Sequence, residues 1–210
     1  MRWISKFLMI TLLISCFTES KNKQIDNNQN EFNQIVDKIV RYKLNRVSVV
    51  QIETMPICKL IPIDSSYMNS HDYPPPPPPD LINYSKDFFS TMIERNLIDS
   101  IDANYMYSII DSSLVIKIDS SLISKPTLTK QYLGSLFNKD IDYAYDYLEK
   151  RFGASCFIRV GTPVFNKART KLILAINYYC GPLDGQGYIF ILKKENNKWM
   201  IIEELGTWES

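Results

Sequence analysis

Three aspartates in one predicted helix are the side chains best suited to acid–base chemistry. Asp142 and Asp146 are four residues apart and are therefore neighbours on a helix surface, with Asp140 just ahead of them. Tyr143 and Tyr147 flank them, and carboxylates beside aromatic rings suit contact with a sugar. The alternative is a solvated helix face with an aromatic rim, which is the commoner origin of this pattern. A glycan hydrolase would need two carboxylates about 5–10 Å apart in a cleft.

Other catalytic arrangements have less support. His71 is the only histidine and lies just before a run of prolines. A serine or cysteine nucleophile needs a base held in packed surroundings, which such a loop does not provide. Zinc sites use several histidines or closely spaced cysteines, and the sequence has neither. The sequence predicts no cofactor and no metal, and it favours a protein that is not an enzyme.

Cys156 and Cys180 occupy matching positions in a predicted hairpin. Facing residues of antiparallel strands have Cα atoms about 5.5 Å apart, which suits a disulfide. An exported chain enters an oxidising compartment, so the pair is a candidate disulfide. Two buried thiols on an apolar face are the alternative, and both interpretations stay open.

Residues 1–15 have the layout of a secretion signal. A basic start precedes an apolar run that is too short to span a bilayer. The run ends in Leu-Ile-Ser-Cys, which resembles the lipobox of bacterial lipoproteins. This resemblance implies that Cys16 carries the lipid, begins the mature chain and anchors it in the bacterial cell envelope. Phe17 follows the cysteine, and under the enteric sorting rule this indicates the outer membrane rather than the inner membrane.

Composition and charge limit the remaining classes. Removal of residues 1–15 deletes two basic residues and no acidic residue, so the formal charge changes from +1 to −1. A near-neutral chain with mixed signs lacks the basic surface that nucleic-acid binding requires. Residues 16–30 are polar and rich in asparagine, and we interpret them as a flexible tether. Residues 31–210 then fit a single domain.

A proline-rich loop is predicted at 55–80, within that domain. Pro74 to Pro79 must be extended as polyproline II, because proline fixes its backbone φ angle. Such a run can dock in an aromatic groove of a protein partner. It can equally act as a stiff surface spacer, and the sequence leaves its role open.

Apolar residues recur at three- and four-residue spacing in four predicted helices. The first covers about 31–44 with Asn30 as its N-cap, and the next two are capped by Ser85 and Ser100. The fourth runs from Ile141 to Phe152 and ends at Gly153 in the left-handed conformation. The stretch 128–137 is ambiguous because a glycine interrupts it. Residues 47–52 and 114–118 are predicted strands.

The segment from Cys156 to Trp208 has the alternation of two long antiparallel hairpins. The first would turn at 167–169 and would pair Ile158 with Tyr178 and Val164 with Leu172. The second would turn at Asn196-Asn197 and pair Phe190 with Glu203, and 181–187 would be a connecting loop. Helices with short strands in the first two thirds, followed by this antiparallel sheet, give the α+β class.

Two family resemblances follow from these residues. The ending Asn-Lys-Trp-Met-Ile-Ile at 197–202 is similar to the final hairpin of many NTF2-like (cystatin-like) domains. With the lipobox, the Asn/Lys/Ile/Tyr-rich composition and Tyr-Tyr-Cys-Gly-Pro-Leu before Gly-Gln-Gly-Tyr, the chain resembles uncharacterised lipoproteins of the Bacteroidetes. The NTF2-like resemblance implies a pocket between sheet and helix. Its expected lining residues are Tyr145, Tyr178, Phe190 and Glu203.

These observations support two main functional hypotheses. The first is a lipid-anchored envelope protein without catalytic activity, which contacts a protein partner or has a structural role. The second is a small-ligand binder with its pocket between the sheet and the helix 141–152. A carboxylate-based glycan hydrolase ranks third. Most NTF2-like enzymes use His/Asp dyads in their cavity, and none can be matched in this sequence, so the resemblance does not imply an enzyme.

Overall fold

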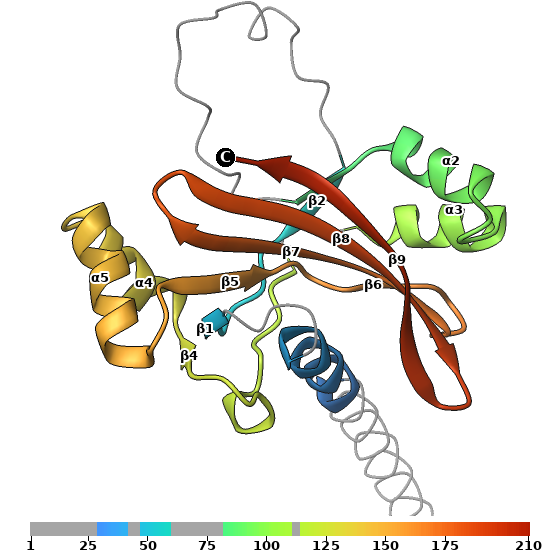
Figure 1. Ribbon diagram of the computed structural model, residues 1–210. Coiled ribbons are helices and arrows are strands. Elements are labelled where there is room, and N and C mark those ends of the chain that lie inside the picture. The colour runs from blue at the N-terminus through green and yellow to red at the C-terminus, as the bar shows by residue number, and fades with distance from the viewer. Residues whose placement is uncertain (1–28, 42–46, 60–81, 111–113) are drawn as a thin grey trace, which may run out of the picture.

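A mixed seven-stranded sheet lies at the centre of the computed structural model (Figure 1). The structure describes residues 29–41, 47–59, 82–110 and 114–210. The strands of this sheet are β1 (Val47–Gln51), β4 (Thr127–Leu128), β5 (Cys156–Val160), β6 (Val164–Phe165), β7 (Lys171–Gly181), β8 (Asp184–Glu195) and β9 (Lys198–Glu209). Their order is β4-β1-β5-β7-β8-β9, with β6 also paired to β7. Strands β4, β1 and β5 run parallel, and the remaining pairs are antiparallel.

Helices cover both faces of the sheet. Helix 29–41 packs on one face, here called the single-helix face. Two helix pairs pack on the opposite face, here called the four-helix face, at different ends of the sheet (Figure 1). These pairs are α2 (Lys86–Glu94) with α3 (Ser100–Ser108), and α4 (Lys130–Phe137) with α5 (Ile141–Phe152). The α+β class is confirmed, and the sheet is larger than the two predicted hairpins because β1 and β4 join it in parallel.

Two short elements complete the described chain. A separate parallel pair is formed by β2 (Ile57–Lys59) and β3 (Ile82–Tyr84), and η2 (Ser120–Leu122) is a short 3-10 helix. Strand β2 lies inside the segment that the sequence predicted as a proline-rich loop. It forms there because Ile57 is buried against β3 and the α2–α3 pair.

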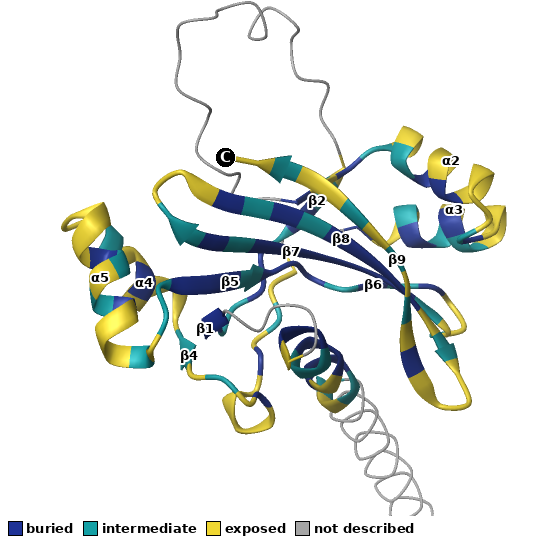
Figure 2. Cartoon of the chain, in the orientation of Figure 1, coloured by how far each residue is buried: buried dark blue, intermediate teal, exposed yellow. Residues whose placement is uncertain are grey.

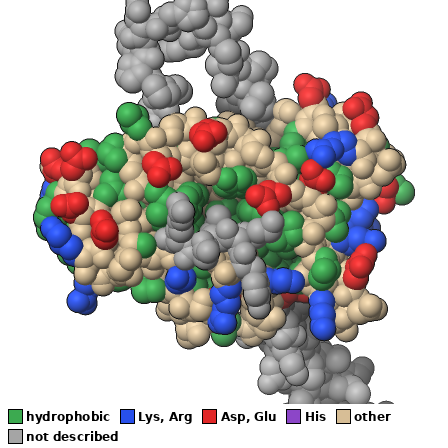
Figure 3. All heavy atoms as spheres, in the orientation of Figure 1, with side chains coloured by type: hydrophobic (Ala, Val, Ile, Leu, Met, Phe, Trp, Pro, Cys, Tyr) green, Lys and Arg blue, Asp and Glu red, His purple; other side chains and the backbone are tan. Residues whose placement is uncertain are grey.

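Strand β7 is buried on both sides. Residues 172–177 are all buried, which explains why their apolar run is nearly continuous. Figure 2 shows similar burial in β5 and in the middle of β8, whereas β9 is exposed at many positions. Acidic and basic side chains both occur across the face shown in Figure 3, in keeping with the near-neutral composition.

Helix 29–41 buries the apolar face predicted for it. The buried residues are Phe32, Ile35, Val36, Ile39 and Val40, which pack against the even-numbered side chains of β5 and β7. The predicted N-cap at Asn30 is wrong, because residues 29 and 30 are already helical. The predicted tether over 16–30 is therefore too long at its end. The expected helix end near residue 44 lies outside the described residues.

Glu31 connects this helix to β8 and β9 through hydrogen bonds. Its carboxylate accepts hydrogen bonds from Lys194 Nζ, from Trp199 Nε1 at 3.0 Å and from Arg169 at 3.3 Å. Burial raises the pKa of Glu31, but the hydrogen bonds from Lys194 and Trp199 outweigh this effect and hold the pKa below its usual value. The carboxylate therefore stays charged at neutral pH and links β8 and β9 to the helix.

Two of the predicted helix caps are confirmed, at Ser85 and Gly153, and the one at Ser100 is wrong by one residue. Ser85 caps α2, because its Oγ accepts a hydrogen bond from Phe88 N at 3.0 Å. The cap of α3 is Asp99 rather than the predicted Ser100, since the Asp99 carboxylate accepts from Asp102 N at 2.7 Å. Gly153 ends α5 with φ of 84°, as predicted. The ambiguous stretch 128–137 contains α4.

The strand predicted at 114–118 is wrong. The segment makes only an isolated bridge, between Lys117 and Glu53. Ile116 N donates to Thr54 Oγ1 at 2.8 Å, and Ile118 N donates to Ile52 O at 2.7 Å. The Thr54 side chain thus accepts a hydrogen bond that a backbone carbonyl would accept in a regular strand pair, and 114–118 does not form a strand.

The first predicted hairpin forms with a change of register along its length. Ile158 faces Tyr178 as predicted. Val164 faces Ile173 rather than Leu172, so that prediction is wrong by one residue. The extra residue lies between β5 and β6, where Thr162 N turns away from β7 and donates to Met55 O at 2.9 Å. Val164 consequently packs on the four-helix face.

The second predicted hairpin also forms and also shifts. Asn196 and Asn197 make the turn with φ of 48° and 61°, which asparagine tolerates. The predicted pairing of Phe190 with Glu203 is wrong, because Phe190 faces Glu204 and Ile191 faces Glu203. One extra residue in β9, next to Glu203, produces this shift.

Candidate functional site

An open cleft of about 430 Å³ lies between the four-helix face of the sheet and the α4–α5 pair. Strands β5 and β7 supply Phe157, Arg159 and Tyr179, and the helices supply Lys130, Phe137 and Tyr145. The other lining residues are Gln51, Leu133, Gly134, Ile141, Gly181, Pro182, Gly185 and Ser210. Clefts of this size between sheet and helices are a usual place for small ligands.

Aromatic rings make the apolar part of the cleft. The rings of Phe157 and Tyr179 stack with centroids 5.0 Å apart and planes inclined by 21°. Phe137 lies 5.3 Å from Phe157 and meets Tyr145 edge-on at 5.1 Å. Burial raises the pKa of Tyr145, and the neighbouring Tyr179 and Asp184 raise it further, so its phenol stays protonated. The packed rings offer a rigid surface for a flat apolar group.

The charged side chains of the cleft come from β5 and α4. Among the described residues that line it, Lys130 and Arg159 are basic and none carries an acidic side chain. Lys130 is placed by Glu53, whose carboxylate accepts from the Lys130 backbone N at 2.6 Å, next to the Thr129 cap of α4. Arg159 is placed by β5, where it faces Asn177 of β7. Two cationic side chains beside an aromatic wall suit a ligand that carries an acidic group.

Trp208 of β9 packs beside Tyr179. Its indole Nε1 donates to Asn177 Oδ1 at 3.1 Å, and its ring lies 5.7 Å from that of Tyr179. The indole can lie flat on β8 because Gly185 and Gly187 have no side chain there. The predicted loop at 181–187 is therefore wrong. Both glycines belong to β8, and only residues 182 and 183 connect it to β7.

A side chain at position 187 is expected to displace the indole. A Cβ there would lie 2.0 Å from Trp208 Nε1 and 2.5 Å from Thr207 Oγ1. Gly187→Ala should therefore lower the free energy of unfolding by about 1–3 kcal/mol. Gly206→Ala is the matched control, because a Cβ there meets nothing within 4 Å. Urea unfolding followed by tryptophan fluorescence measures both, and equal stability of the two variants would contradict the packing described.

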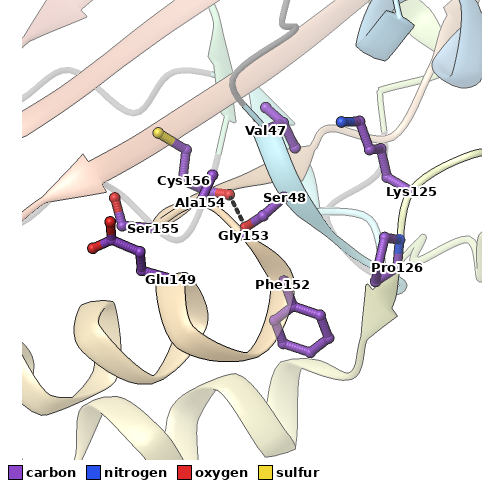
Figure 4. A pocket seen from close by; sticks show the side chains of 10 residues that line it. All are labelled: Val47, Ser48, Lys125, Pro126, Glu149, Phe152, Gly153, Ala154, Ser155 and Cys156. Carbon is purple, nitrogen blue, oxygen red and sulfur yellow. Dashed lines mark hydrogen bonds between the residues drawn. The ribbon is translucent and has the colours of Figure 1, made fainter.

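A second hollow, of about 580 Å³, opens where α5 ends and β5 begins. Lys125 and Glu149 lie on opposite sides of it (Figure 4). The Ser48 hydroxyl donates to Cys156 O at 2.8 Å and so serves the backbone (Figure 4). The polar groups drawn there do not converge on one point, and the aromatic cleft is the better candidate.

The four predicted lining residues do not share one pocket. Tyr145 lines the cleft. Tyr178 and Phe190 pack on the single-helix face, so the sheet separates them from Tyr145. Glu203 accepts a hydrogen bond from Arg95 at 2.6 Å, beside α2. Side chains alternate across a strand, and the choice of face was therefore wrong for the two aromatic residues.

The cysteines are placed as follows. Cys156 and Cys180 form a disulfide between β5 and β7. Cys58 is a free thiol that donates to Asn83 Oδ1, and burial raises the pKa of this thiol. Of the two interpretations left open by the sequence, the structure therefore contains the disulfide.

The predicted carboxylates do not converge in a cleft. Asp140 caps α5 by accepting from Tyr143 N at 2.7 Å. Asp146 lies 3.6 Å from Lys150 on the outer surface of the same helix. Within the described part of the chain, no group of three or more His, Cys, Asp or Glu side chains is arranged to hold a metal ion. No helix in the described ranges is long and apolar enough to cross a membrane.

Gln51, Lys130 and Arg159 were not recognised from the sequence. The sequence did contain an indication for Arg159. Both faces of its neighbour β7 are apolar, and a charged side chain next to such a strand is unusual unless it has a function. Lys130 follows Thr129, a good helix cap that the glycine at 134 obscured. Cys16, His71 and Pro74 to Pro79 lie outside the described residues.

Comparison with family models, with curated proteins and with solved structures finds no match to this chain. The NTF2-like and lipoprotein resemblances therefore stay predictions.

Proposed function

We propose that this domain is a binding protein whose cleft holds a small molecule with a flat apolar body and an acidic group. The observation that supports the proposal is the position of Arg159 and Lys130 beside the stacked rings of Phe157 and Tyr179. The rings would contact the apolar body, and the two cations would bind the acidic group by charge-assisted hydrogen bonds. The described lining of the cleft combines an aromatic wall with basic side chains, and this combination suits the binding of a ligand.

The lipobox-like ending at Cys16 places this binding at a membrane of the bacterial cell envelope in our proposal, with the outer membrane favoured over the inner membrane. A tether ahead of helix 29–41 would give the domain some reach from the lipid surface. We also propose that Pro74 to Pro79 contact a protein partner, as a second contact of the chain.

A matched pair of fluorescent probes tests the cleft. 8-Anilino-1-naphthalenesulfonate carries an aromatic body with an anionic group, and N-phenyl-1-naphthylamine has the same body without the charge. The anionic probe is expected to bind, and Arg159→Gln should weaken its binding at least about tenfold, since hydrogen bonds to charged groups contribute about 1.5–3 kcal/mol. Binding of the neutral probe should change little in the same variant.

Lys193→Gln is the control for that experiment. Lys193 is also a strand cation, but its side chain is 48% exposed and pairs with Glu195 at 3.0 Å, away from the cleft. Its replacement should leave the binding of both probes unchanged. The proposal fails if Arg159→Gln and Lys193→Gln bind the anionic probe equally well while circular dichroism shows both to be folded.

A further inference from the structure

Three tyrosines form an exposed surface on the outer side of the α4–α5 pair. Tyr143 and Tyr147 lie one turn apart on α5, with ring centroids 6.3 Å apart and planes inclined by 32°. Tyr132 of α4 joins them through a 2.8 Å hydrogen bond between its hydroxyl and that of Tyr147. Tyr143 is 50% exposed and Tyr132 is 40% exposed. We call these three residues the tyrosine surface.

Packing accounts for Tyr147, which lies against the core of the α4–α5 pair, but it does not account for the exposure of Tyr143 and Tyr132. The side chains of α5 that are fully buried are Ala144 and Leu148, which face the sheet. Tyr143 is instead half exposed, which leaves apolar surface in contact with water. Exposed aromatic residues that gather in one place commonly mark a binding site. Tyrosine suits this role because it offers a large, rigid contact area with a polar tip.

The polar groups around the tyrosine surface indicate the chemistry of its ligand. A shallow groove of about 330 Å³ is lined by Tyr143, Asp146, Tyr147, Lys150 and Arg151. Asp146 and Lys150 lie 3.6 Å apart, and their side chains are 68% and 79% exposed. The groove thus presents a carboxylate acceptor and cationic donors side by side. A hydroxyl group donates and accepts at once, and therefore matches such a mixed set.

We propose that the tyrosine surface binds a neutral saccharide chain. The C–H faces of successive sugar rings would lie on Tyr143 and Tyr147, and the sugar hydroxyls would bind Asp146, Lys150 and the Tyr132 hydroxyl. A neutral chain of sugars supplies many hydroxyl groups at once, and so can use the acceptor on Asp146 and the donors on Lys150 and Arg151 together. This site is separate from the aromatic cleft, since the two linings have no residue in common.

Saturation-transfer difference NMR with chitopentaose, cellopentaose and maltopentaose tests the proposal. At least one of these neutral pentasaccharides is expected to receive saturation from aromatic protons of the protein. Tyr143→Ser should weaken its binding at least about tenfold, because it removes both the stacked ring and the apolar area that the ring would bury. Tyr143→Phe keeps the ring and should bind within about threefold of the unchanged protein.

Ile101→Ser is the control. Ile101 lies on α3 and is 79% exposed, so this change also removes an exposed apolar side chain, away from the tyrosine surface. It should leave saccharide binding unchanged, and so should Arg159→Gln in the cleft. The proposal is overturned if none of the three pentasaccharides binds. It is also overturned if Tyr143→Ser, shown to be folded by circular dichroism, binds as tightly as Tyr143→Phe.

Discussion

Reduction of the disulfide between Cys156 and Cys180 is expected to lower the free energy of unfolding by about 3 kcal/mol. The bond joins residues separated by 24 positions, so it restricts a sizeable loop of the unfolded chain. Reduction should change the folded state less than the unfolded state, because β5 and β7 stay paired by their backbone hydrogen bonds. Guanidinium unfolding with and without dithiothreitol measures the difference directly.

Two cysteine variants make this test specific. Cys58→Ala should keep the full effect of dithiothreitol, because Cys58 is a free thiol. The double variant Cys156→Ala with Cys180→Ala should lose it and resemble the reduced protein. Equal stability of oxidised and reduced protein, or a mass showing three free thiols after export, would contradict the disulfide.

The effect would also reach the cleft. Arg159 lies three residues after Cys156 on β5, and Tyr179 precedes Cys180 on β7. A weaker connection at this end of the two strands should let both residues move more freely. We therefore expect the anionic probe to bind more weakly to the reduced protein than to the oxidised protein.

Cys16→Ala is expected to abolish lipid attachment completely. The lipobox-like sequence predicts that this thiol carries the acyl chain, and a buried acyl chain contributes about 0.8 kcal/mol per CH₂ to membrane binding. Labelling cells with radioactive palmitate measures the attachment. Partition between detergent and aqueous phases then shows whether the protein has lost its anchor.

Cys58→Ala is the control for acylation and should be labelled like the unchanged protein. Palmitate label is the decisive reading, because an uncleaved signal could hold the variant at the membrane without any lipid. An unchanged protein that takes up no palmitate would refute the lipoprotein prediction. The structure of the domain and its cleft would not be affected by that result.

Local features of this protein could be read from its sequence. The apolar face of helix 29–41, the cap at Ser85, the stop at Gly153 and the turn at Asn196-Asn197 all depend on residues a few positions apart. Spacing and side-chain chemistry are sufficient there, because a helix turn or a tight turn satisfies its own backbone. The α+β class followed from the order of such elements.

Registers and faces required the tertiary structure. Thr162 leaves the ladder to bind Met55, which is more than a hundred positions away, and this shifts Val164 by one residue. Gly185 and Gly187 looked like a loop because the indole of Trp208 that covers them comes from another strand. In both cases the interacting residue is distant in the sequence, so rules based on neighbouring residues could not predict the contact.

The candidate cleft shows the same division most clearly. Gln51, Lys130 and Arg159 have nothing in common along the chain, and they meet only because β1 lies parallel to β5 while α4 packs over both. The sequence by itself determined most of the helices, the turn at Asn196-Asn197 and the alternation of the long strands, since each is set by near neighbours. Which side chains share a cavity was decided by strand order and bulges, because burial is shared among segments that are distant in the chain.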